Sequence, residues 1–263
     1  MPHVESHTQG TICWVDLATT DQEAATRFYT GLFGWETFDL PMPGGPGVYR
    51  FFRQGGRDTA AVGQLPPEMA AQGVPSAWNV WVAGDAGQAA ERAQAAGGSV
   101  AMPPTDMGPS GRMTMLTDPG GAVIGVWQAG EHIGAGVVGE PGAMTWWEVN
   151  TRAFDDCKRF YGQVFGWTAQ DLPDDNVNYV TWHRDDTMVG GMLEMTAEWE
   201  GIPGHWMAYF AVADTDEAAK RAAELGGQVM QPPFDTPYGR MAVLRDPTGA
   251  TVSIIKPTQP IPG

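Results

Sequence analysis

An internal repeat constrains the fold of this chain more than any other feature of its sequence. The segment RFYTGLFGW, which ends at Trp35, returns as RFYGQVFGW, which ends at Trp167. Further along, DPGGA beginning at Asp118 returns as DPTGA beginning at Asp246. Matches in the same order along both halves indicate a tandem duplication.

The duplication divides the chain into two predicted domains. A glycine-rich stretch, GAGVVGEPG, spans residues 134–142 and is expected to link them. We place the first domain at residues 8–132 and the second at residues 142–258.

Each half is predicted to form a strand, a helix and further strands, twice over. Residues 11–17 alternate apolar and polar side chains, as in a half-buried strand. Thr20 and Glu23 have the spacing of a capping box, and Gly34 is expected to end the helix that follows. Corresponding patterns predict further helices after Asp85, over 154–165, and over 215–225 after Asp214.

The predicted fold class is therefore α+β, with four βαβββ units whose curved mixed sheets are each covered by a helix on one face. Burying the remaining open faces should create clefts. A concave small-molecule site is expected there.

The order of the motifs resembles the vicinal oxygen chelate superfamily of glyoxalases, bleomycin-resistance proteins and extradiol dioxygenases. The motifs are FYxxxFGW at the end of the first helix, a Gly-Gly stop at Gly97 and Gly98, and DPxG before the last strand. The resemblance covers nearly the whole chain and implies two glyoxalase/bleomycin-resistance-like domains. It leaves the activity open, because this fold serves lyases, isomerases, dioxygenases and proteins that only bind.

The resemblance also marks the positions where metal-using relatives place His, Gln or Glu. In this chain those positions hold Trp14 and Trp146, Asn79 and Met207, Gly63–Gln64 and Gly191–Met192, and Gly125 and Ser253. A divalent ion needs three or four donors together, and neither half supplies them. We therefore predict a protein with neither metal nor cofactor.

Eleven tryptophans are many for this length, and several fall at the predicted clefts. The expected ligand-binding residues are Trp14, Trp146, Trp78, Trp206, Trp127, Asn79, Met207 and Ser253. The small Gly125 and Ser253 are expected to leave room for a ligand. The alternative is that the tryptophans only fill a cavity.

Asp16 and Glu148 share a strand face with Trp14 and Trp146, and they are the candidate catalytic acids. Burial would raise their pKa and suit them to proton transfer. The alternative is a structural pairing with Arg112 or Arg240. His132 and His183 are expected in solvated loops.

The charge balance limits the partners. With 31 acidic and 15 basic residues the net charge is −16, which disfavours nucleic acid and anionic membranes. No leader-like or spanning apolar segment is present, and the two cysteines form no disulfide framework. The expectation is a cytoplasmic monomer or homodimer.

The predicted function is metal-independent binding of an aromatic or cationic organic molecule, as in sequestration of a toxic compound or natural product. The main alternative is an isomerase, lyase or cyclase of the same fold that uses Asp16 or Glu148 as general base. A metal-dependent glyoxalase-like lyase or dioxygenase is a third possibility.

Overall fold

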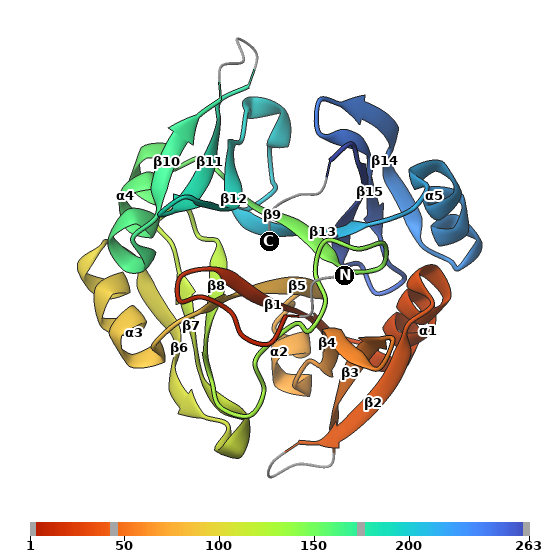
Figure 1. The fold of residues 1–263 in the computed structure, drawn as a ribbon, viewed down its shortest axis with the longest axis horizontal. Helices are drawn as coiled ribbons and strands as arrows, with labels where there is room; N and C mark the ends of the chain where they lie inside the picture. Colours follow the sequence, from red (N-terminus) through yellow and green to blue (C-terminus); the bar gives the residue numbers. More distant parts are fainter. Residues whose placement is uncertain (1–3, 43–46, 173–176, 260–263) are drawn as a thin grey trace.

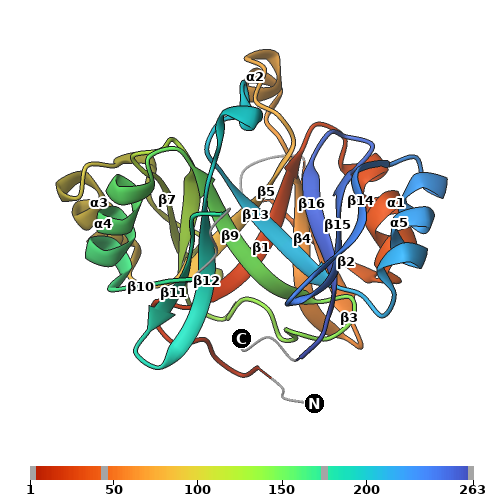
Figure 2. The same cartoon turned by 90° about the horizontal axis from the view of Figure 1, so that it is seen from above.

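The strands form two eight-stranded mixed sheets, one from each half of the sequence (Figures 1 and 2). The computed structural model describes residues 4–42, 47–172 and 177–259. Each sheet joins two βαβββ units, as the repeat predicted. The α+β fold class with open, curved sheets is confirmed.

The first half supplies one sheet, in the strand order β2-β3-β4-β1-β5-β8-β7-β6. Its elements are β1 (Ile12–Thr19), α1 (Gln22–Phe33), β2 (Glu36–Pro41), β3 (Val48–Gln54), β4 (Arg57–Gln64), α2 (Pro67–Ala71), β5 (Ala77–Ala83), α3 (Ala86–Ala95), β6 (Ser99–Asp106), the short 3₁₀ helix η1 (Gly108–Ser110), β7 (Gly111–Thr117) and β8 (Val123–Ala129).

The second half supplies the other sheet, in the order β10-β11-β12-β9-β13-β16-β15-β14. Its elements are β9 (Met144–Thr151), α4 (Phe154–Phe165), β10 (Thr168–Asp171), β11 (Tyr179–Arg184), β12 (Thr187–Glu194), the 3₁₀ helix η2 (Ala197–Trp199), β13 (His205–Ala211), α5 (Thr215–Glu224), β14 (Gln228–Thr236), β15 (Gly239–Arg245) and β16 (Thr251–Pro257).

Helix ends follow the local signals in the sequence. Gly34 ends α1 in the left-handed conformation with a φ of 73°, which glycine adopts without a steric penalty. Asp85 and Asp214 cap α3 and α5 as predicted. The predicted capping box is off by one position, because Asp21 rather than Thr20 is the N-cap and accepts from the Ala24 amide.

The two sheets pack against each other through their helix-covered faces. Helix α1 lies beside α5, and α3 lies beside α4, at the two flanks of this interface (Figure 1). Strands β5 and β13 meet in the middle, where the Trp78 ring lies 5.1 Å from that of Phe210. One hydrophobic core therefore runs through both halves, and it includes Trp14, Phe51 and Trp81 from the other face of the first sheet.

The repeated motifs tie the halves together reciprocally. Tyr29, from FYxxxFGW of the first half, donates a 3.0 Å hydrogen bond to Asp246, from DPTGA of the second half. Tyr161, from FYxxxFGW of the second half, donates a 2.7 Å hydrogen bond to Asp118, from DPGGA of the first half. The motifs predicted as local helix-packing and turn signals thus act across the interface.

The tryptophans that end the first helix of each half make the same kind of contact. The Trp35 indole donates to the carbonyl of Gly142, and the Trp167 indole donates to the carbonyl of Gly10. Both rings are buried. A buried indole N–H needs a partner, and here the other half provides it.

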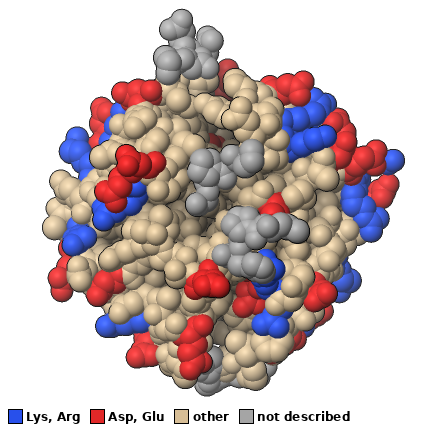
Figure 3. Space-filling view, viewed as in Figure 1, with Lys and Arg blue, Asp and Glu red and all other residues tan. Residues whose placement is uncertain are grey.

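The surface agrees with the charge balance of the sequence. On the face in Figure 3, acidic and basic side chains are scattered around the rim and form no single basic patch. Among the helices of the described residues, none is long and apolar enough to cross a bilayer.

Candidate ligand-binding clefts

The open face of the first sheet has Asp16 at its centre. Asp16 on β1 lies opposite Asn79 on β5, so both side chains project from the same face. One carboxylate oxygen accepts hydrogen bonds from the Asn79 amide at 3.0 Å and from the Trp81 indole at 2.8 Å. The other accepts from the Tyr49 hydroxyl at 2.9 Å. Asp16 is therefore surrounded by uncharged donors.

A relay extends this cluster to Trp14. The Trp14 indole donates to the Tyr49 hydroxyl at 3.0 Å, and that hydroxyl donates in turn to Asp16. Trp14 is buried, with 4% of its side chain exposed. Its nitrogen is occupied by the bond to Tyr49, and its ring packs against Phe51 and His132.

The second sheet repeats the arrangement around Glu148. Its carboxylate accepts from the Tyr209 hydroxyl at 2.7 Å and from the Tyr179 hydroxyl at 3.0 Å. The Trp146 indole donates to Tyr179 at 3.1 Å, so the relay of the first half is present here too. Met207 lies opposite Glu148, in the place that Asn79 has in the first half. Each carboxylate cluster is thus built within one half of the chain.

Burial dominates the electrostatics of both clusters. It raises the pKa of Asp16 and of Glu148, against the opposing effect of the hydrogen bonds each carboxylate receives. Burial also raises the pKa of Tyr49 and Tyr179 well above 10. The neighbouring carboxylates add to this rise, because a phenolate beside a carboxylate is repelled. Burial thus favours the protonated form of each acid, and the phenols stay neutral.

The predicted alternative of arginine pairing is wrong for these two acids, since their recorded partners are Tyr, Trp and Asn side chains. Arg240 instead pairs at the surface with Asp216 and Asp235. Arg112 lies exposed on β7.

The small residues on the last strands do not have the same role in the two clefts. A Cβ placed on Gly125 would lie 2.2 Å from the Trp81 ring, so that ring occupies the space that we expected a ligand to use. In the second half Ser253 lies beside Tyr209, a smaller ring than Trp81. The expectation of free space at Gly125 is therefore wrong.

His132 closes one end of the first cleft. Its ring lies 4.8 Å from that of Trp14, 5.2 Å from Phe51 and 5.7 Å from Trp127. The Trp127 indole donates to the His132 carbonyl at 2.7 Å and holds this segment in place. His132 was expected to be solvated, but burial between these rings lowers its pKa. Its sequence position alone gave no sign of this packing.

Trp78 and Trp206 do not line the clefts, although both were expected there. They lie on the helix-covered faces and donate to the hydroxyls of Tyr29 and Tyr161 in the shared core. In WNVWV, Trp81 and not Trp78 shares the face of Asn79, since side chains alternate along a strand.

Sequence reasoning missed four cleft residues: Tyr49, Tyr179, Trp81 and Tyr209. A signal was present, because Tyr49 corresponds to Tyr179, and Trp81 to Tyr209, in the repeat. Trp14, Asn79, Trp146, Met207 and Ser253 do lie on the open faces, and Trp127 lies at the end closed by His132.

The donor chemistry of the clefts does not fit a divalent metal ion. Where metal-using relatives were expected to place ligands, the open faces carry indole rings, a thioether, glycines, the amide of Asn79 and the hydroxyl of Ser253. The carboxylate of Asp16 faces N–H and O–H hydrogens, which a cation would repel. Within the described residues, no group of three or more His, Cys, Asp or Glu could hold an ion.

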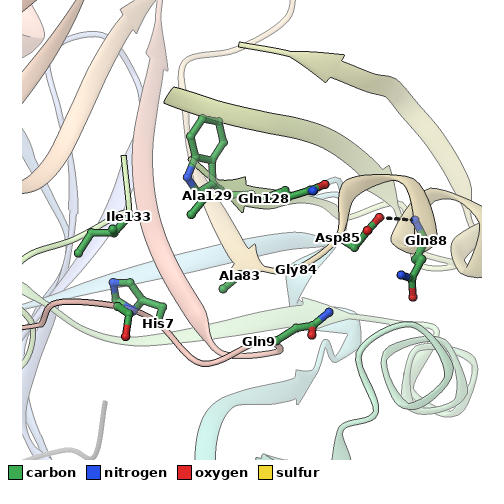
Figure 4. A pocket seen from close by; sticks show the side chains of 11 residues that line it. His7, Gln9, Ala83, Gly84, Asp85, Gln88, Gln128, Ala129 and Ile133 are labelled. Carbon is green, nitrogen blue, oxygen red and sulfur yellow. Dashed lines mark hydrogen bonds between the residues drawn. The ribbon is translucent and has the colours of Figure 1, made fainter. Parts of the chain in front are cut away.

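A separate pocket of about 410 Å³ lies between the N-terminal segment, the start of α3 and the end of β8 (Figure 4). Its polar groups are already engaged: Asp85 accepts from the Gln88 amide, and the His7 ring bonds the Ala135 carbonyl. The central clefts carry the more specific chemistry.

Comparison with known sequences places both halves in one family. A sequence model of the Glyoxalase/Bleomycin resistance protein/Dioxygenase superfamily matches residues 11–126 and 133–254. The "Putative glyoxylase CFP32" of Mycobacterium tuberculosis is 45% identical over 260 residues, covering 98% of each chain. The "Anthracycline biosynthesis protein DnrV" of Streptomyces peucetius is 38% identical over 262 residues, covering 94% of this chain and 93% of that one.

Solved structures share the fold at low sequence identity. The Mn(II)-bound glyoxalase from Novosphingobium aromaticivorans has a TM-score of 0.63 at 15% identity, covering 97% of this chain and 84% of that one. The duplicated sequence, the paired eight-stranded sheets and these matches lead to one conclusion. The chain belongs to the Glyoxalase/Bleomycin resistance protein/Dioxygenase superfamily, as a member with two tandem domains.

Proposed function

We propose that this protein binds a planar organic molecule in its aromatic clefts without a metal ion. The observation that carries the proposal is the surrounding of Asp16 and Glu148 by indole, phenol and amide donors. Such a carboxylate is a poor ion ligand, yet it provides a fixed polar point on an apolar floor, as small-molecule sites commonly do.

The floor of the second cleft suits a flat ring system. Its apolar residues form a small cluster of their own, apart from the shared core: Met207, Tyr209, Ile255, Trp146 and Met241. Thioether and aromatic groups contact ring faces favourably and adapt to their shape.

The similarity to two proteins named for anthracycline biosynthesis favours a polycyclic natural product as the ligand. Anthracyclines are planar and often cationic, and the net charge of −16 suits a cationic ligand. Sequestration of such a compound is the specific role that we propose.

A direct test titrates the purified protein with a planar cationic polycyclic compound and follows tryptophan fluorescence. We expect saturable quenching, a ligand recovered chemically unchanged, and no stoichiometric Zn, Ni, Mn or Fe in protein prepared without chelator. Stoichiometric metal that supports binding would overturn metal independence, and lack of any binding would overturn the proposal.

A second candidate is an enzyme of the same fold with Glu148 as general base. The raised pKa of this buried carboxyl favours it, since a carboxylate of raised pKa is the stronger base. In that case the ligand would be turned over, and Glu148→Gln would slow turnover more than it weakens binding.

A further inference from the structure

The number of hydrogen-bond donors and acceptors around Glu148 limits what Tyr179 can offer a ligand in the second cleft. A phenol has one hydrogen to donate and two lone pairs that accept. Tyr179 accepts from the Trp146 indole and gives its only hydrogen to Glu148. While Glu148 is ionised, Tyr179 has no hydrogen left for a ligand.

Protonation of Glu148 reverses the direction of that bond. If the proton resides on the oxygen next to Tyr179, the acid becomes the donor and Tyr179 the acceptor. The phenol then has both lone pairs filled, by Trp146 and Glu148, and its own hydrogen is free to point elsewhere. Tyr179 is half-buried on β11, whereas Tyr209 is 7% exposed, so Tyr179 is the more accessible of the two phenols.

We propose that the Glu148–Tyr179 pair is a proton-coupled hydrogen-bond donor that recognises a carbonyl oxygen on a planar ligand in the second cleft. Binding of a ligand carbonyl to Tyr179 takes up one proton from solvent onto Glu148. This inference rests on the proposed function and specifies the ligand class: a ring system bearing a ketone or quinone oxygen.

The described residues that donate hydrogen bonds to Glu148 are uncharged, so they do not override this coupling. Tyr209 approaches from β13 and Tyr179 from β11, while β12 presents Gly191 opposite the carboxyl. The nearest histidine on the same face of β13 is His205, which bonds the Pro203 carbonyl and faces Asn150. Among the ion pairs of the described residues, none includes Glu148.

Gly191 leaves the space that the hydrogen bond between Tyr179 and Glu148 needs. A Cβ there would lie 1.9 Å from the Tyr179 hydroxyl, so a larger residue would displace the phenol from Glu148. At the equivalent Gly63 the nearest atom is a Tyr49 ring carbon at 3.5 Å. The first half also adds Asn79 and Trp81 as donors to Asp16, and these support the ionised form. The switch therefore belongs to the second cleft.

The test compares two probes that differ only in carbonyl groups: an anthraquinone and an anthracene, each with the same trimethylammonium-methyl substituent. Calorimetry measures their affinities between pH 5 and 9. We expect the anthraquinone to bind about tenfold more tightly, as one added hydrogen bond of ordinary strength implies. Tyr179→Phe should remove this preference, so that the two probes bind this variant with equal affinity. Tyr238→Phe, which removes an exposed phenol in the turn before β15, should keep it.

Proton uptake is the second readout, and it uses the unaltered protein. Titrations in buffers of different ionisation enthalpy should show up to one proton taken up per anthraquinone, with affinity falling by up to about tenfold per pH unit once Glu148 is ionised in the free protein. Glu148→Gln keeps an N–H donor toward Tyr179, so it should retain the carbonyl preference with no proton uptake.

The outcomes separate this inference from the proposed function. If neither probe binds, both fail. If both probes bind equally, or if the preference survives in Tyr179→Phe, the switch is overturned and planar-ligand binding stands. Anthraquinone preference without proton uptake anywhere from pH 5 to 9 overturns the coupling.

Discussion

The two clefts descend from one duplicated pattern, but their chemistry differs. In the first, Asp16 receives three hydrogen bonds, Trp81 fills the space above Gly125, and His132 packs against Trp14. In the second, Glu148 receives bonds from two phenols, and Trp146 is half-buried. Among the described residues, the first carboxylate is therefore the more fully hydrogen-bonded and the more closely packed of the two.

The largest expected effect comes from giving the first cleft the larger residue that the second cleft has at the equivalent position. Gly125→Ser gives the first cleft the residue that the second has at Ser253, but places a Cβ 2.2 Å from the Trp81 ring. We expect a loss of about 3 kcal/mol in the free energy of unfolding, because the ring must leave its site. Denaturant titration measures the loss.

A double variant tests whether the clash is the cause. Trp81→Tyr in the Gly125→Ser background reproduces the pairing of Ser253 with Tyr209, and it should recover at least about 1 kcal/mol of the loss. Simple additivity of the two single effects would contradict the proposed difference in packing.

A smaller effect is expected from paired alanine substitutions at the glycines under the tyrosines. Gly191→Ala should cost about 2 kcal/mol, because the Tyr179 hydroxyl is displaced and Glu148 loses a donor. Gly63→Ala should cost less than about 0.5 kcal/mol, since the neighbouring Tyr49 carbon is at ordinary contact distance. Thermal and denaturant unfolding of both variants measure the contrast, and equal losses would contradict it.

The pH dependence of stability provides the next comparison. Since burial raises the pKa of Glu148 in the folded protein, the folded state binds more protons than the unfolded state between 4.5 and that raised pKa. Stability should therefore fall as the pH rises through this window, by about 1.4 kcal/mol for each unit of the pKa difference. Glu148→Gln should flatten this part of the profile.

Asp16→Asn provides the matched variant in the first cleft. Its amide can accept from fewer of the three surrounding donors, so we expect it to destabilise the protein at every pH in addition to flattening the profile. If Asp16→Asn and Glu148→Gln give the same dependence of stability on pH, the proposed difference between the two clefts is wrong.

The smallest effect concerns His132, which is present at only the first cleft. Burial lowers its pKa below 6.5, so the unfolded state binds the extra proton first as the pH falls. The stabilisation by the neutral ring should be complete above pH 6.5 and be lost as the pH falls through the lowered pKa, with an amplitude of about 1 kcal/mol. His132→Gln should remove this loss, which urea titrations at pH 7 and pH 5 can detect; an unchanged loss would assign it to another group.

The sequence by itself determined the fold and much of the cleft geometry. The repeat gave two copies of the same sheet, aspartate and glycine fixed helix ends, and alternation placed Asp16, Trp14, Glu148 and Trp146 on the open faces. These are short-range signals, because caps and strand alternation depend on a few neighbouring residues.

Only the tertiary structure decided which groups meet in space. It joined Tyr29 to Asp246 across the halves, placed Trp81 over Gly125, and brought His132, which follows β8, to Trp14. Such contacts depend on how curved sheets bring distant segments together and on which neighbouring side chain fills a given volume. A single sequence carries no local signal for either. Although Tyr49 and Tyr179 recur in the repeat, their bonds to Asp16 and Glu148 emerged only once the sheets were assembled.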